Sequence, residues 1–249
     1  MQESIPVGAA EARPIEATTT VASPATPGEP LMDPRALQIL STEHWSLLAS
    51  RSLAYNEAFS RAGMFLSFLS ATLIVIGFLI GSQRLSSAVV PVAGVLLLAD
   101  LYIGMAAVGR LLDASGEELQ CVRGMNRIRH AYREMVPGLE PYFVSGFHDD
   151  ARGVLATYGF VERPGVLPNL IHGLTTMIGM VATIDAMILG ALGALVAIGL
   201  GAGFEVAMPL AVVGFLAGFM LFGIAGTRGA MAQQARAESR FPSPDVPRL

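Results

Sequence analysis

Two aspartates, Asp100 and Asp185, stand inside apolar segments that are otherwise free of charge. An ionised carboxylate near the centre of a bilayer costs about 2.5 kcal/mol or more, so such a residue is a candidate functional group. A helical rise of about 1.5 Å per residue puts Asp100 roughly 15 Å and Asp185 roughly 20 Å from the polar end of its segment. The hydroxyls of Ser70 and Thr72 reach roughly 14 to 17 Å on the same scale. This shared depth predicts a proton or cation site between helices; the alternative is that the acids only supply interhelical hydrogen bonds.

Four arginines crowd the polar stretch that follows the second apolar segment: Arg123, Arg127, Arg129 and Arg133. Members of this set that lie four residues apart place like charges on one helix face, which is unfavourable. An opposite charge must therefore come from elsewhere. Anionic lipid headgroups or a phosphate-bearing ligand would supply it. Acids within the fold, such as Glu43 or Glu57, are the alternative source.

Other chemistry finds little support in the sequence. Residues 148–150 (HDD) carry metal-binding atoms, but with His130 and His172 they do not make the spacing of a metal motif, and either aspartate is explained as a helix N-cap. The single cysteine, Cys121, excludes a CxxC site. No nucleophile–base pair, phosphate loop or dinucleotide fingerprint occurs. The net charge of −4 excludes broad binding of nucleic acid. We therefore expect a non-enzymatic protein without metal or cofactor.

Four apolar stretches must position these residues, and each is long enough to cross a hydrocarbon core, which takes about 20 residues. They are Ala62–Ile80, Leu85–Gly109, Gly173–Gly203 and Val206–Gly226. Only 14% of the residues are charged, against about 25% in a soluble domain, so too few polar side chains remain to cover such helices in water. The sequence predicts an all-α integral membrane protein in which four transmembrane helices form two hairpins, with a small helical cytoplasmic region.

The remaining segments follow from composition and from helix signals. Residues 1–32 are rich in Ala, Pro, Thr and Glu and lack aromatics, which predicts a disordered tail. Ser115 and Glu118 have capping-box spacing, which predicts that a helix begins there. This helix is expected to stop before Pro137, and a second, short helix is expected after Asp149. The predicted order is an amphipathic cytoplasmic helix (33–61), a transmembrane hairpin (62–110), a cytoplasmic helical region (111–172), a second hairpin (173–227) and a cytoplasmic tail (228–249).

Small residues mark helix contacts in the second hairpin. Ala182, Ala186, Gly190 and Ala194 recur at every fourth position of the third apolar segment, and Gly214 with Gly218 forms a GxxxG pair on the fourth. Such rows let two helix backbones approach closely in lipid. We expect them to mark packing contacts; the alternative is that the glycines of the third segment allow a bend or a gate.

The distribution of arginine predicts the orientation in the membrane. All 16 basic residues are arginines, and only Arg84 lies in a loop between two helices of a hairpin. The others lie in the N-terminal region, the middle region and the C-terminal tail. Because cytoplasmic segments carry the excess of basic residues, we expect both termini in the cytoplasm. No basic start followed by an apolar core occurs in residues 1–30, so no cleavable signal peptide is predicted.

Several short segments resemble a group of uncharacterised integral membrane proteins that is common in high-GC bacteria. The likeness covers residues 37–200 and is carried by Ser41–Leu48 (STEHWSLL), Tyr55–Arg61 (YNEAFSR), Met125–Arg127 (MNR), Pro141–Phe143 (PYF) and His148–Asp150 (HDD). The resemblance implies a multi-pass topology and a place in the bacterial inner membrane, and it implies no activity.

Two functions remain open at this point. The first is a channel-like or transport-associated membrane protein with Asp100 and Asp185 at its polar centre. Its expected partners are the lipid bilayer and further copies of the same chain, as a homo-oligomer. The second is a membrane-anchored signalling or scaffold protein that works through its arginine-rich cytoplasmic helix.

Overall fold

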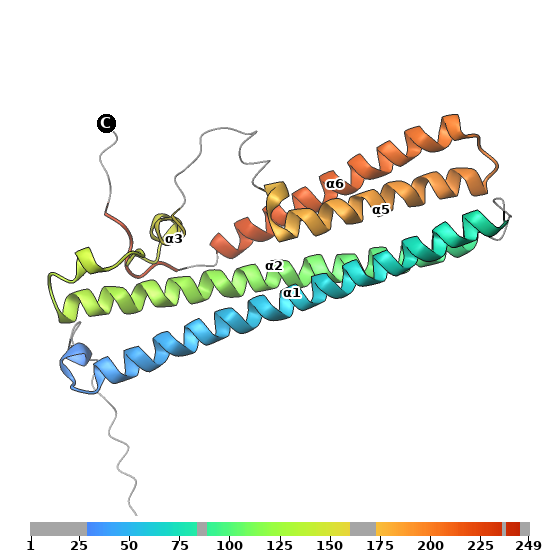
Figure 1. Cartoon of the computed structure of the whole chain (residues 1–249). Coiled ribbons are helices and arrows are strands. Elements are labelled where there is room, and N and C mark those ends of the chain that lie inside the picture. Colours follow the sequence, from blue (N-terminus) through green and yellow to red (C-terminus); the bar gives the residue numbers. More distant parts are fainter. Residues whose placement is uncertain (1–28, 84–88, 160–172, 236–237, 245–249) are drawn as a thin grey trace, which may run out of the picture.

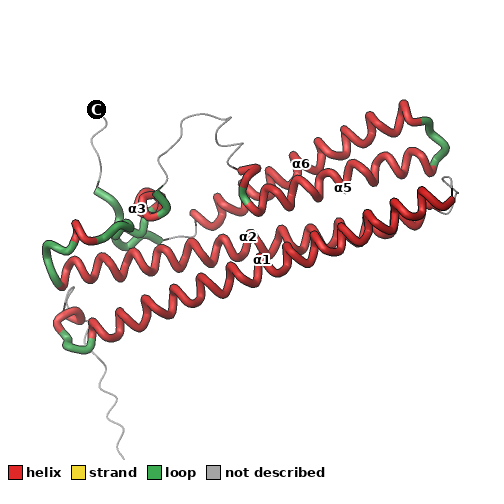
Figure 2. The backbone as a smooth tube through the Cα atoms, viewed as in Figure 1, coloured by secondary structure: helices red, strands yellow, loops and turns green. Residues whose placement is uncertain are grey.

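The computed structural model describes residues 29–83, 89–159, 173–235 and 238–244, which form helices and turns without a strand among them (Figures 1 and 2). The elements are η1 (Glu29–Met32), α1 (Ala36–Gln83), α2 (Val89–Met135), η2 (Glu140–Tyr142), α3 (Ala151–Thr157), α5 (Met177–Gly199) and α6 (Phe204–Ala235). Four of them, α1, α2, α5 and α6, are long and apolar enough to cross a membrane. The prediction of an all-α protein with four such helices in two hairpins is confirmed. Most of the predicted disordered tail lies outside the described residues.

Helices α1 and α2 are much longer than a membrane crossing requires. Each has close to 50 residues and therefore spans about 70 Å, more than twice a hydrocarbon core of about 30 Å. Helix α1 joins the predicted amphipathic segment to the first apolar stretch without interruption. Helix α2 likewise runs from the second apolar stretch through Arg110 to Met135, across the predicted segment boundary.

The predicted helix start at Ser115 is wrong, because α2 is continuous there. A capping box favours a helix start only where the residues before it are not helical. The stretch from Met105 to Ala114 contains no proline or turn sequence that would interrupt the helix. The predicted end is confirmed: α2 stops at Met135, and Gly138 adopts a left-handed φ of 93° in the turn that follows.

The four long helices pack as a row in the order α1, α2, α5, α6, so that α2 and α5 lie in the middle (Figure 1). Helix α1 buries one stripe, made of Ala54, Ala58, Ala62, Phe65 and Thr72. The spacing of three and four residues is that of helices packed at a small angle. Most other apolar side chains of α1 and α6 are exposed, as lipid-facing residues are in a membrane.

Helices α5 and α6 meet through small residues, in the rows that the sequence marks as packing contacts. A Cβ atom on Gly190 would lie 2.6 Å from the carbonyl oxygen of Ala211, and one on Gly214 would lie 3.1 Å from the Cα of Gly190. One on Gly218 would lie 3.1 Å from the Cα of Ala186. The backbones are therefore in direct contact, which only small side chains allow.

Helices α1 and α5 end, and α2 and α6 begin, at the same end of the row, whereas α3, η1 and the last described residues lie at the other end (Figure 1). We call the second end the α3 end. Both hairpins therefore point the same way, as four crossings with two long polar segments on one side require.

We predict that Gly190→Ala lowers the stability of the protein by about 1–3 kcal/mol, because the new methyl group overlaps backbone that cannot retreat. Gly223→Ala is the matched control, since nothing lies within 4 Å of a Cβ there. It gains helix propensity at no steric cost. Thermal melting in detergent should rank Gly190→Ala below wild type and Gly223→Ala at or above it; equal melting of the two variants would contradict the close α5–α6 contact.

Candidate functional site

Asp100 on α2 and Asp185 on α5 are both fully buried, with exposed fractions of 1% and 0%. Among the residues that the structure describes, neither carboxylate oxygen of Asp185 has a hydrogen-bond partner, and Oδ2 of Asp100 has none either. Buried polar atoms are normally paired, and a buried carboxylate without a donor is costly. The described residues therefore supply no hydrogen-bond donor to these three carboxylate oxygens.

Gly104 provides the space for Asp185. The carboxylate of Asp185 lies directly against this glycine. A Cβ atom placed on Gly104 would overlap Oδ1 of Asp185 and would lie 2.6 Å from its Cγ and 2.8 Å from its Oδ2. Because Gly104 follows Asp100 by four residues, the two lie on the same face of α2, one turn apart. The two acids therefore occupy neighbouring levels, with Asp185 at the level of Gly104, one turn nearer the α3 end than Asp100. The predicted depths give the opposite order, because they are counted from Arg110 on one helix and from His172 on the other. Sequence reasoning missed Gly104, although its spacing from Asp100 was a usable signal.

The two hydroxyls predicted to accompany the acids have different positions. Ser70 is exposed, and its hydroxyl donates to the carbonyl of Leu66 one turn earlier. Thr72 is buried in the α1 stripe that faces α2. Neither hydroxyl donates to Asp185 or to Oδ2 of Asp100. The acids thus come together without Ser70.

Two apolar grooves lie on either side of the acid pair. One, of about 1120 Å³, is lined by residues of α2, α5 and α6 that include Leu98, Leu101 and Leu189. The other, of about 560 Å³, lies nearer the α3 end and includes Leu112 and Ala182. Neither lining contains Asp100 or Asp185, so helix contacts separate the acids from both grooves.

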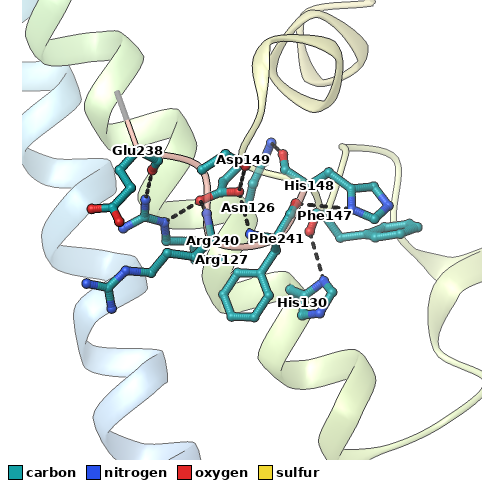
Figure 3. Close-up of polar contacts among 10 residues, drawn as sticks. Asn126, Arg127, His130, Phe147, His148, Asp149, Glu238, Arg240 and Phe241 are labelled. Atoms are coloured by element: carbon teal, nitrogen blue, oxygen red, sulfur yellow. Dashed lines mark hydrogen bonds and ion pairs between the residues drawn. The ribbon is translucent and has the colours of Figure 1, made fainter. Parts of the chain in front are cut away.

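A second polar cluster lies at the α3 end and is centred on Asp149 (Figure 3). This carboxylate is buried and accepts four hydrogen bonds. The donors are the backbone N–H of Arg240 (2.9 Å) and of Phe241 (2.8 Å), the hydroxyl of Ser239 (2.8 Å) and Nε of Arg127 (2.7 Å). The N–H of Asp149 donates in turn to the carbonyl of Phe241. Asp149 therefore holds the C-terminal segment, Glu238–Pro244, against α2 and α3.

The electrostatics of this cluster favour the ionised form of Asp149. Burial alone would raise the pKa of its carboxyl group, but the N–H groups of Arg240 and Phe241, the Ser239 hydroxyl and Arg127 together hold that pKa well below its ordinary value. Asp150 is the N-cap of α3, accepting from the N–H of Gly153 at 2.9 Å. The short helix expected after Asp149 is thus confirmed, and Asp150 also accepts from the hydroxyl of Ser243.

Three of the four predicted arginines are engaged within the fold. Arg127 contacts Asp149 and the carbonyl of Glu238; Arg133 pairs with Glu140 at 3.3 Å and lies over the Phe147 ring. Arg129 donates to Asn126 and Gly146, neither of which is charged. Among the residues that the structure describes, Arg123 has no hydrogen bond or ion pair, and its Nε is buried. Glu57, one of the acids expected to serve these arginines, pairs with Arg61 and Arg110 instead.

The histidines support the docked C-terminal segment. The ring of His130 stacks on Phe241 with 4.2 Å between centroids, and Nδ1 of His148 lies 3.3 Å from the carbonyl of Phe241. Over the described ranges, no group of three His, Cys, Asp or Glu side chains is placed to hold a metal ion. His172 lies outside those ranges.

We predict that Asp149→Asn releases the C-terminal segment, because an amide cannot pair with Arg127 as a carboxylate does and turns N–H donors toward the backbone N–H groups. Hydrogen exchange of the Arg240 and Phe241 amides should accelerate about tenfold or more, as expected for loss of charge-assisted hydrogen bonds. Glu238→Gln is the matched control, since only the backbone carbonyl of Glu238 contacts Arg127. Unchanged exchange in Asp149→Asn would show that the segment is held by other contacts.

The depressed pKa of Asp149 gives this contribution a defined pH window. A group with a lowered folded pKa stabilises the folded form above its unfolded pKa of about 3.9, and the effect is lost as the pH falls through the folded pKa. The difference in exchange between wild type and Asp149→Asn should therefore be constant from about pH 8 to 5 and shrink only below about pH 4. A difference that already vanishes near pH 6 would exclude Asp149 as its source.

Comparison with protein-family models, with curated proteins and with solved structures found no match for this chain. A function must therefore be argued from its own residues. The two features that call for an explanation are the unpartnered acids Asp100 and Asp185 within the helix row and the polar cluster around Asp149 at the α3 end.

Proposed function

We propose that this chain is a non-enzymatic protein of the bacterial inner membrane that takes up and releases a proton at Asp100 and Asp185 as part of a transport process. The observation that carries the proposal is the burial of both acids while both oxygens of Asp185 and Oδ2 of Asp100 have no donor among the described residues. A carboxylate inside a membrane protein needs a proton, a cation or hydrogen-bond donors. Since the described residues supply no donor to Asp185, we take the missing partner to be the transported or coupling species.

The surroundings favour a proton over a metal or hydrated cation. Ca²⁺ takes six to eight oxygen ligands and Mg²⁺ usually keeps several waters, whereas the Asp185 carboxylate is pressed against Gly104 and lines neither groove. The grooves on either side are lined mostly by apolar residues. A proton needs one carboxylate oxygen and no ligand shell.

The helix row also supports a homo-oligomer. An open row leaves α1 and α6 with long apolar faces, which lipid or further copies of the chain must cover. Copies that pack against these faces would remove them from lipid, while the acids are already buried within each copy.

The arginine distribution supports a cytoplasmic α3 end with both chain termini on that side. The resemblance to bacterial integral membrane proteins supports the inner membrane. In this orientation α1 and α2 project from the membrane into the cytoplasm, where their projecting ends, α3 and the C-terminal segment form a polar unit.

That projecting unit favours a second function, a membrane-anchored signalling or scaffold protein. The specific observation is that the C-terminal segment docks on α2 and α3 through side chains from three parts of the chain, Arg127, Asp149 and Ser239. A surface held in this way is suited to recognition of a soluble partner.

We predict that Asp185→Asn abolishes proton flux in proteoliposomes while the melting temperature changes little, because the amide keeps the shape but cannot titrate. Gly104→Ala should also abolish flux, since its methyl group would occupy the place of the Asp185 carboxylate. Gly94→Ala is the matched control on the same helix, because nothing lies within 4 Å of a Cβ there.

The outcome separates a functional acid from a structural one. Wild-type flux in Asp185→Asn would overturn the proton site. Loss of flux in Asp185→Asn and Gly104→Ala, but not in Gly94→Ala, would support it. A purely structural role has a different signature. Asp185→Leu would then melt at a far lower temperature than Asp185→Asn, while Asp100→Asn and Asp185→Asn would both retain flux, and the acids would serve only the packing of α2 on α5.

We predict that reporter fusions at Pro30, Ser82, Gly146, Ala202 and the C-terminus read cytoplasm, periplasm, cytoplasm, periplasm, cytoplasm. The reason is the bias of arginine toward the N-terminal, middle and C-terminal regions. A periplasmic signal at Gly146 would contradict both the orientation and the four-crossing topology.

A further inference from the structure

A polar cavity of about 660 Å³ lies beside the projecting part of α2, distinct from the intramembrane acids. One side is a face of α2 that runs from Arg110 to Arg127, and the other is the C-terminal segment, which contributes Glu238 and Arg240. Arg123 lies on the α2 side of this cavity. The cavity is therefore built from two parts of the chain more than 100 residues apart.

The charges around the cavity are unequally compensated. Arg110 is neutralised by Glu57 and Glu117, and Arg127 by Asp149. Within the part of the chain that the structure describes, no acid pairs with the guanidinium of Arg123 or of Arg240. Asp113, the other acid on this face of α2, precedes Arg123 by ten residues and so lies about 15 Å away along the helix.

Arg123 is the group that most requires a partner. Its Nε is buried and makes no hydrogen bond, and an unpaired buried donor of a charged group is costly. Among the common anionic groups, carboxylate and phosphate oxygens match the guanidinium fork. The carboxylate of Glu238 also lines the cavity, so an additional ligand must compete with it, which a doubly charged phosphate does better than a single carboxylate.

We infer that this cavity binds a phosphate-bearing anion, held by Arg123 from α2 and Arg240 from the C-terminal segment. Arg127 completes the basic wall. A rise of about 1.5 Å per residue places Arg123 about 20 Å beyond Arg110, whereas the headgroup layer is only about 5–8 Å thick. A soluble phosphate compound therefore reaches the site more readily than a lipid headgroup does.

Binding of the anion is linked to docking of the C-terminal segment. The N–H of Arg240 donates to Asp149, so this arginine reaches the cavity only while the segment is docked. An anion that binds only the docked form stabilises that form by mass action. Docking of the segment thus becomes a readout of anion binding that needs no knowledge of the physiological ligand.

The test uses the full chain in detergent, with pyrophosphate as the probe and hydrogen exchange of the Arg240 and Phe241 amides as the readout. At ten times the dissociation constant, pyrophosphate should slow this exchange about tenfold relative to sodium chloride at equal ionic strength. Arg123→Gln should need about tenfold or more pyrophosphate for the same slowing. Arg228→Gln on α6, which does not line the cavity, is the matched control and should respond as wild type does.

Two results would overturn the inference: no slowing in wild type beyond the chloride control, or equal slowing in Arg123→Gln and wild type. A second arm identifies the source of the phosphate by comparing nanodiscs of phosphatidylglycerol with nanodiscs of phosphatidylcholine, without free phosphate. Slowing in phosphatidylglycerol alone that is lost in Arg123→Gln would support the same arginine site with a lipid headgroup as ligand. Slowing by pyrophosphate alone would support a soluble ligand.

Discussion

The contact of α5 with α2 at Gly104 is the constraint on which the arrangement of the helices depends. Helix α2 can accept the buried Asp185 only where it has no side chain, so this glycine fixes the level at which the second hairpin packs on the first. Small residues then bring α6 onto the other side of α5. The row of four helices thus follows from close backbone contacts rather than from large interlocking side chains, as in many membrane proteins.

The buried aspartates of this protein show two opposite solutions to the same physical problem. Asp149 is surrounded by four donors and holds two distant segments together. Asp185 has no donor among the residues that the structure describes. A carboxylate that only stabilised the fold would be expected to resemble Asp149, because the hydrogen bonds offset the cost of burial. This contrast is the physical argument for the proposed exchange of a proton at Asp185.

Most of the helix row could be predicted from the sequence, whereas little of the cluster at the α3 end could. Apolar length predicts the four long helices, and small-residue spacing predicts that Gly190 lies in a close helix contact but not that α6 is its partner. Local cap signals failed at Ser115 because an uninterrupted helix overrides them, but they succeeded at Asp150, where the chain enters α3 from an extended conformation. The docking of Ser239 and Phe241 on Asp149 could not be predicted, because it joins residues about 90 apart and neither partner has a periodic pattern. An aromatic residue in a polar tail was the only available signal.

Helix α2 is common to both candidate sites. Asp100 and Arg123 lie about 35 Å apart on one continuous helix, and the residues between them, such as Val108 and Leu111, are buried in a packed core. A helix held in this way does not bend locally at either site, so a ligand that moved α2 at one end would displace it along its length. Communication between the acid pair and the C-terminal segment would then require α2 to shift against α1, together with the α5 helix whose Asp185 is seated at Gly104. The small side chains of α1 at this interface, Ala54, Ala58 and Ala62, offer few interlocking groups to resist such sliding.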